Sequence, residues 1–143
     1  MKSGVASFAV TVMLATSAFA APPKPISVDQ SGSFLIDAAT SERLWKETTP
    51  ARVVKLYPPK KFRFASEITG GFNETKTCIV SARAMLLPVV FLPIQGTKVI
   101  YAPIKSATAF DAVPNLSRDQ CQALARTKLK ESIQSLTSAL AAS

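Results

Sequence analysis

The segment KTCIVSARAMLL, residues 76–87, decides the expected fold because its polarity alternates along the chain. Thr77, Ser81 and Arg83 alternate with residues that are apolar or small. A period of two residues is typical of a half-buried β-strand, with one face in the core and the other in water. The inner face of this strand is expected to carry Cys78, Val80, Ala82, Ala84 and Leu86.

Two flanking segments have the features of partner strands. In KFRFASEI, which ends at Ile68, Phe62 and Phe64 alternate with charged residues, and Ser66 is the one polar residue on the inner side. Gly70 and Gly71 then permit a chain reversal, because glycine adopts positive φ without a side-chain penalty. A third strand, KVIYAPIK, is expected at residues 98–105. These strands would form an antiparallel meander with one solvated face.

The C-terminal segment has the features of an amphipathic helix that begins near Ser117. Ser117 is a suitable N-cap and Gln120, three residues on, completes a capping box. Arg126, Lys130 and Gln134 would lie on the solvated side. The apolar stripe recurs at spacings of three and four, through Cys121, Ala125, Leu129, Ile133, Leu136 and Leu140. The expected fold is therefore α+β: an antiparallel sheet of three to five strands, covered on one face by this helix.

The segments before residue 61 give weaker signals. Residues 34–36 could form a short edge strand, and TSERLWKE, which contains Trp45, could form a helical turn. Pro50 suits the first position of a short helix over about residues 50–57, although Val53 and Val54 would also fit a strand.

Two cysteines are expected to form a disulfide bond. Cys78 lies on the apolar face of a predicted strand, and Cys121 begins the apolar stripe of the helix that would cover that face. Export would place both thiols where disulfides persist. A redox or metal role is the weaker interpretation, because the two cysteines are far apart and two thiols cannot complete a tetrahedral site.

Residues 1–20 have the pattern of a secretory signal peptide. Lys2 precedes an apolar stretch that ends in Ala18-Phe19-Ala20, a small-x-small sequence typical of signal-peptidase sites. An uncleaved anchor is the alternative, but the apolar part has about 15 residues against the ~20 that a spanning helix needs. After cleavage we expect a proline-rich leader at residues 21–25, one α+β domain at 26–143, and a periplasmic or secreted location without a membrane span.

The chain is basic, with 17 Lys and Arg against 9 Asp and Glu, a net charge of +8. This excess favours contact with an anionic surface or an envelope protein. Nucleic acid is not an expected partner, because an exported protein seldom meets it and the basic residues show little aromatic interleaving.

Few residue patterns point to catalysis. The sequence has no histidine, the commonest general base, and no nucleophile motif or glycine-rich phosphate loop. No metal or cofactor is expected. Glu42, Glu47 and Glu67 could still converge in space, so a cell-envelope hydrolase that uses carboxylates is the alternative to a non-enzymatic protein.

Two features suggest binding to a partner. The first is the uncharged stretch MLLPVVFLPI, residues 85–94, which is either buried under neighbouring loops or forms an exposed apolar loop. The second is a basic sheet face, which is either a solvated surface or a binding surface. The candidate partner-binding residues are Leu87, Val89, Val90, Phe91 and Leu92 in the loop, and Lys61, Arg63, Lys76 and Arg83 on the face. Together they would suit anionic lipid or another envelope component.

Overall fold

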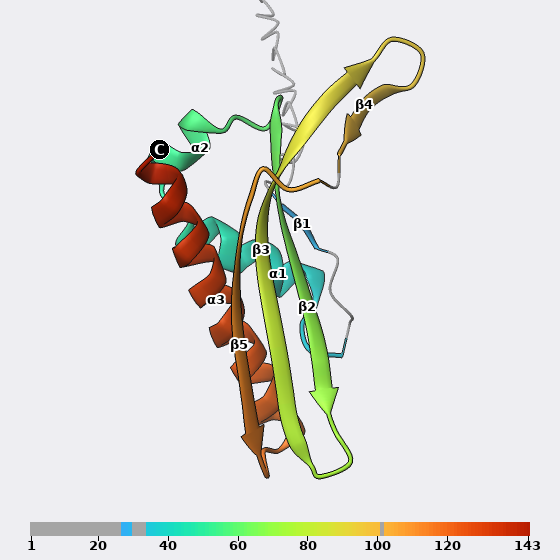
Figure 1. Ribbon diagram of the computed structural model, residues 1–143, viewed down its shortest axis with the longest axis vertical. Coiled ribbons are helices and arrows are strands. Elements are labelled where there is room, and N and C mark those ends of the chain that lie inside the picture. Colours follow the sequence, from blue (N-terminus) through green and yellow to red (C-terminus); the bar gives the residue numbers. More distant parts are fainter. Residues whose placement is uncertain (1–26, 30–33, 101) are drawn as a thin grey trace, which may run out of the picture.

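The computed structural model describes residues 27–29, 34–100 and 102–143 (Figure 1). The predicted signal peptide and the proline-rich leader lie outside these residues. In chain order the elements are β1 (Ser27–Asp29), α1 (Ala38–Thr48), α2 (Ala51–Leu56), β2 (Phe62–Phe72), β3 (Thr77–Leu92), β4 (Gly96–Val99), β5 (Lys105–Pro114) and α3 (Arg118–Ala141). The α+β fold predicted from the sequence is confirmed.

Strand β3 is the centre of a five-stranded sheet. It pairs antiparallel with β2 along one edge, from Phe62 opposite Pro88 to Phe72 opposite Cys78. The short β1 extends the sheet beyond β2 in parallel. Helices α1 and α3 lie on one side of the sheet, which we name the inner face, and the opposite side is the outer face (Figure 1).

Strands β4 and β5 follow each other along the second edge of β3. The amide of Ile100 donates to the carbonyl of Pro88 and that of Ile104 to the carbonyl of Leu86, each at 2.9 Å. Carbonyls two residues apart in a strand point to the same edge, so β4 pairs with the end of β3 and β5 with its beginning. Pro88 lies where the pairing passes from one strand to the other, a position that tolerates its missing N–H.

The prediction of a single strand at residues 98–105 is therefore wrong. Only Lys98 and Val99 of that range belong to β4, and Lys105 begins β5, which runs to Pro114. Pro103 lies in the connection between β4 and β5. Proline has no backbone N–H to donate to a strand ladder, so it suits this position better than the middle of a strand. The short edge strand suggested for residues 34–36 is absent as well, since residues 34 and 35 form a turn.

The reversal between β2 and β3 lies later than the glycines suggested. Gly70 and Gly71 belong to β2, and residues 73–76 make the turn. The side-chain oxygen of Asn73 accepts hydrogen bonds from the amides of Thr75 (3.1 Å) and Thr77 (2.9 Å). Lys76 has φ +57°, a left-handed conformation that closes the turn. An asparagine that bonds the backbone ahead of it is a frequent initiator of such turns.

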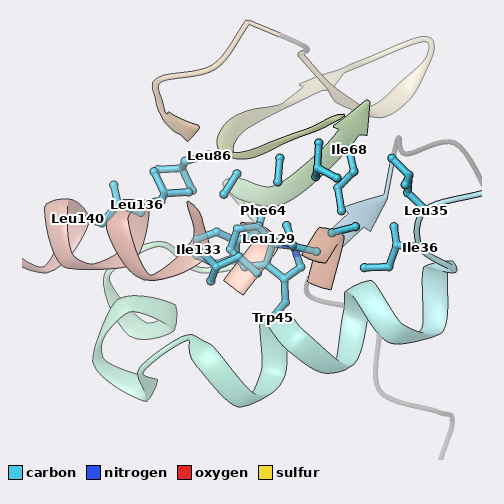
Figure 2. Packing of buried hydrophobic residues seen from close by; sticks show 14 of the residues in the cluster. Leu35, Ile36, Trp45, Phe64, Ile68, Leu86, Leu129, Ile133, Leu136 and Leu140 are labelled. Carbon is cyan, nitrogen blue, oxygen red and sulfur yellow. The ribbon is translucent and has the colours of Figure 1, made fainter. Parts of the chain in front are cut away.

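The core lies between the inner face and the helices (Figure 2). All five residues predicted for the inner face of β3 are fully buried, and so are the six of the helical stripe, with at most 2% of any side chain exposed. Trp45 of α1 is buried against Phe64, at 5.1 Å between ring centroids. The polar exception, Ser66, accepts a hydrogen bond from the Trp45 indole (3.3 Å) and exchanges one with Ser41 (2.8 Å). A buried hydroxyl needs such partners, because an unpaired one would be destabilising.

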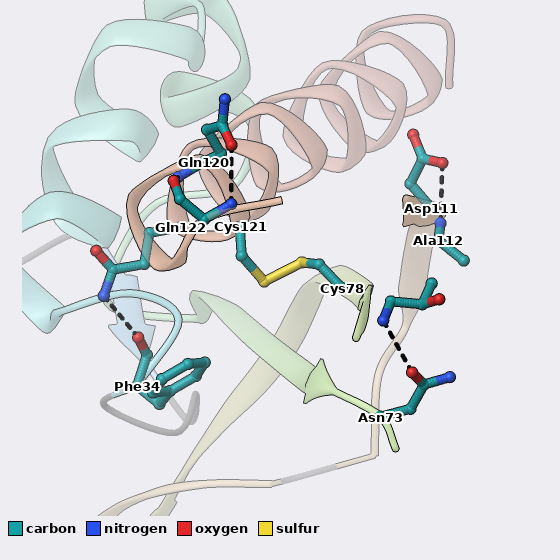
Figure 3. Close-up of a disulfide and its surroundings, with 10 residues drawn as sticks. Phe34, Asn73, Cys78, Asp111, Ala112, Gln120, Cys121 and Gln122 are labelled. Atoms are coloured by element: carbon teal, nitrogen blue, oxygen red, sulfur yellow. Dashed lines mark hydrogen bonds between the residues drawn. A yellow bond between two sulfur atoms is a disulfide. The ribbon is translucent and has the colours of Figure 1, made fainter. Parts of the chain in front are cut away.

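The predicted disulfide between Cys78 and Cys121 is confirmed. It joins the first turn of α3 to the beginning of β3, with 5.8 Å between the Cα atoms and a sequence separation of 43 (Figure 3). The helix begins as expected, because the Ser117 hydroxyl accepts from the amide of Gln120 and the Gln120 side chain accepts from the amide of Ser117. A further bond, from the Gln122 side chain to the carbonyl of Phe34 (2.9 Å), holds the segment before α1 against α3.

Polar contacts fasten the other elements to α3. Lys128 lies 3.2 Å from the Asp111 carboxylate on β5 and 2.9 Å from Glu131, and its hydrogen bonds to Glu131 and Asp111 raise its pKa. Arg52 of α2 donates to the carbonyl of Ala141 at the end of the helix. Helix α2 confirms the helix predicted at about residues 50–57, and α1 extends the suggested helical turn to 11 residues.

Replacement of both cysteines, Cys78→Ala with Cys121→Ala, should lower the free energy of unfolding by about 2–4 kcal/mol, because the unfolded chain gains the freedom of a 43-residue loop. Urea denaturation followed by circular dichroism would measure this change. A double variant as stable as the wild type would show that the bridge does not contribute to folding.

Gly70→Ala should destabilise the protein more than Gly71→Ala. Both residues have φ between +129° and +137°, so either alanine should cost about 1–2 kcal/mol in backbone strain. A methyl group at Gly70 would also overlap the carbonyl of Ile79, whereas the nearest atom to one at Gly71 is in the Phe34 ring, at 3.9 Å. Equal stability loss in the two variants, measured by thermal unfolding, would contradict this difference.

Candidate functional site

Among the described residues, the two most exposed large apolar side chains lie on the hairpin formed by the end of β3, residues 93–95 and β4. We name residues 89–99 the apolar hairpin. Phe91 is 73% exposed, Leu92 37% and Ile94, at the tip, 98%. The hairpin projects beyond the sheet and the helices (Figure 1). Each of the two alternatives for residues 85–94 holds for one part of the stretch: residues 85–87 are buried and residues 91–94 are exposed. The predicted binding residues Val89 and Val90 lie between these parts and are half-buried.

The hairpin turn is built from local sequence signals. The amide of Gln95 donates to the carbonyl of Leu92 (3.1 Å), which closes a tight turn with Pro93 and Ile94 at its centre. Gly96 follows with φ +73°, which is readily available to glycine. A tight turn followed by a left-handed glycine is a common three-residue hairpin connection. The ladder pairs Leu92 with Gly96, so Ile94 lies at the apex.

The base of the hairpin is buried on the outer face. Ala65, Met85 and Leu87 form a small apolar cluster there, against which Val99 packs. Leu87 is fully buried, so it anchors the hairpin and is not part of its exposed surface. The outer face is therefore not solvated along its whole length.

Basic side chains lie at the base of the hairpin and on β4. We name Lys60, Lys61, Arg63 and Lys98 the basic collar. The amide of Val89 donates to the carbonyl of Lys61 (2.7 Å), which places that residue where the hairpin leaves the sheet. A hollow of about 450 Å³ is lined by Lys60 and Arg63 together with Pro59, Phe91 and Thr97.

The turn before β2 holds the collar in place. The amides of Lys61 and Phe62 donate to the carbonyl of Pro58, at 2.9 and 3.0 Å. Arg63 donates to the carbonyl of Pro59 (2.6 Å), and the rings of Tyr57 and Phe62 meet edge to face at 5.3 Å. These contacts fix the backbone that carries the basic side chains beside the hairpin.

The other two predicted basic residues lie elsewhere. Lys76 is in the turn at the opposite end of β2 and β3. Arg83 lies opposite Glu67 in the register and 3.5 Å from the hydroxyl of Ser106. The structure thus brings Lys61 and Arg63 to the apolar hairpin and separates Lys76 and Arg83 from it.

The outer face also carries a polar hollow of about 320 Å³. It is lined by Glu67, Thr69, Ser81, Arg83, Ser106 and Thr108. Its one carboxylate, Glu67, is the only member of the predicted glutamate group found there. Glu42 lies 2.7 Å from Lys46 and Glu47 lies 4.0 Å from Arg43, both on α1 in ordinary i,i+4 pairs. The three glutamates therefore do not line one pocket.

Comparisons with known proteins do not assign this chain to a family. No family model, curated protein or solved structure matches it. Among the residues described, no group of three or more His, Cys, Asp or Glu side chains is placed to hold a metal ion. No helix of the described segments has the length and apolar character that crossing a bilayer requires.

Sequence reasoning missed three members of the site: Lys60, Ile94 and Lys98. One signal could have found the lysines, because no acidic residue lies between Glu47 and Glu67 or between Glu74 and Asp111. The two segments that carry these lysines, residues 48–66 and 75–110, therefore contain basic residues but no acidic ones. Ile94 could have been found as the residue after Pro93 in a turn closed by glycine.

Two aspartate substitutions only four residues apart should differ in their effect on stability. Leu87→Asp should lower the free energy of unfolding by more than about 3 kcal/mol, because it places a carboxylate in a closed apolar cluster. Phe91→Asp should change it by less than about 1 kcal/mol, since the side chain is largely exposed. Chemical denaturation measures both, and a large loss in Phe91→Asp would show that the exposed hairpin supports the fold.

Proposed function

We propose that this chain is an exported, non-enzymatic binding protein that contacts a component of the cell envelope through the apolar hairpin and the basic collar. The observation that carries the proposal is the exposure of Phe91 and Ile94 on a projecting hairpin beside Lys60, Lys61 and Arg63. Single exposed apolar residues are common on protein surfaces, but several together on one projection are typical of an interaction site.

Charge favours an anionic partner. From Thr48 to Ser66, and again from Thr75 to Phe110, every charged residue is Lys or Arg. The hairpin and the collar lie within these two ranges, so neither of them presents an acidic side chain of its own to an approaching anionic surface. Complementary charge steers association, and apolar contacts then slow dissociation.

Export is supported by two independent features. The disulfide between Cys78 and Cys121 is of a kind that persists in oxidising compartments. Residues 1–20 have the sequence pattern of a signal peptide. A periplasmic or secreted location therefore belongs to the proposal.

The alternative, a hydrolase that works through carboxylates, has less support. Such an enzyme needs two carboxyl groups on either side of the scissile bond, within about 10 Å of each other. Glu67 lies on the outer face of the sheet, whereas Glu42 and Glu47 are on α1, which packs on the inner side. This arrangement does not favour the three glutamates as one site.

Recovery of partners from envelope fractions tests the proposal. The wild-type protein, immobilised through a tag, should retain at least one envelope component that Phe91→Asp retains at less than about a tenth of the wild-type level. The matched control is Phe110→Asp, because Phe110 is also an exposed phenylalanine, at 63%, but lies on β5 opposite Ser81. The control should retain the component at the wild-type level.

Equal recovery of every component by the wild type and by Phe91→Asp would exclude the hairpin as the binding surface. Loss in both phenylalanine variants would point to the sheet face, and the proposal would fail in that case as well.

A further inference from the structure

We infer that the envelope component bound by the hairpin is the surface of an anionic lipid bilayer, into which the hairpin inserts at interfacial depth. This inference rests on the proposed function and names its partner. It is carried by the distribution of apolar residues on the hairpin, by its shape and by the sign of the surrounding charge.

The apolar character extends to both faces of the hairpin. Successive residues of a strand point to opposite faces, so Val89 and Phe91 lie on one side and Val90 and Leu92 on the other. Exposure persists on both sides, at Phe91 and at Leu92, and continues at Ile94 on the tip. A protein groove covers one face of a ribbon, whereas a lipid interface surrounds all of it. The second face is thus better explained by lipid than by a protein partner.

The hairpin is too short and too open to go deeper than the interface. It has four residues in β4 and four paired residues in β3, about 13 Å of strand. An isolated two-stranded ribbon also leaves backbone groups unpaired at its outer edges, which the hydrocarbon core does not tolerate. A depth of about 5–10 Å, at the boundary of head groups and acyl chains, suits both its length and its backbone.

The basic collar lies where the head groups would be. Lys61 is at the base of the hairpin, and Lys98 lies opposite Val90 within the ladder. The Lys98 ammonium donates to the side-chain oxygen of Gln95 in the hairpin turn. The lysine side chain is long and flexible, so on insertion the ammonium can leave Gln95 and reach the head-group layer while its methylene groups remain among apolar neighbours. Each basic residue close to a negatively charged leaflet strengthens adsorption, and salt screens this attraction.

Vesicle sedimentation provides the direct test. The probe is a set of vesicles of phosphatidylcholine alone and of phosphatidylcholine with 30% phosphatidylglycerol, mixed with protein recovered from the periplasm whose mass shows that the leader is absent. The wild type should bind the anionic vesicles at least tenfold more tightly than the neutral ones. This binding should weaken as salt rises from 50 to 500 mM.

Matched variants separate insertion from simple charge attraction. Phe91→Asp and Ile94→Asp should each weaken binding to anionic vesicles at least tenfold, whereas Phe110→Asp, which changes the charge equally, should not. The double variant Lys60→Glu with Lys61→Glu should also weaken binding at least tenfold. Its control is Arg126→Glu with Lys130→Glu on the exposed side of α3, which should bind as the wild type does.

Fluorescence reports the depth of insertion. Trp45, the one tryptophan of the chain, is fully buried, so lipid should leave its emission unchanged. In Ile94→Trp a new indole stands at the tip. Its emission should shift to the blue with anionic vesicles and be quenched by lipids brominated near the head of the acyl chain.

Three outcomes would overturn the inference. The first is the absence of binding to anionic vesicles, and the second is binding that Phe91→Asp and Ile94→Asp leave unchanged. The third is an Ile94→Trp emission that does not respond to vesicles. If the wild type ignores vesicles but still recovers an envelope protein in a Phe91-dependent manner, the partner is that protein. The inference then falls while the proposed function stands.

Discussion

The packing of α3 against β3 is the constraint on which the rest of the structure depends. The inner face of β3 is made of small or apolar side chains, and the helix can lie close to it because two of them, Ala82 and Ala84, are alanines. The disulfide joins the two elements covalently at one end. With this pair fixed, β2 and β5 align on either edge of β3, and α1 closes the remaining side of the core with Trp45.

The candidate site is an extension of the same strand. The first part of β3 is held between two neighbours and covered by a helix, while its residues beyond Val89 pair with β4 alone. Leu87 marks the transition, because it is the last fully buried residue before the exposed hairpin. The base of the hairpin is thus packed against the body of the protein, and its apolar residues are exposed only beyond Leu87.

The sequence predicted the elements that depend on short-range periodicity. Burial was predicted correctly by the alternation in β3 and by the helical stripe from Cys121 to Leu140, and the capping box at Ser117 marked the start of the helix. The two buried faces together predicted the disulfide. The division of residues 96–114 into two strands was not visible, because it depends on which stretch of the β3 edge each strand occupies. Likewise, the sequence did not reveal that Lys76 and Arg83 lie away from Lys61. Their distances depend on the register of β2 and β3, which composition does not specify.

The long, continuous strand β3 defines the long axis of the molecule. Its 16 residues extend over about 50 Å from the Asn73–Lys76 turn to the hairpin. A protein attached at its hairpin would therefore stand as a stalk, with the bridged end of the helix and the Asn73–Lys76 turn farthest from the point of attachment (Figure 1). That distant end, with Phe34 under the Arg118 guanidinium at 5.0 Å, would be the part presented to the surrounding space.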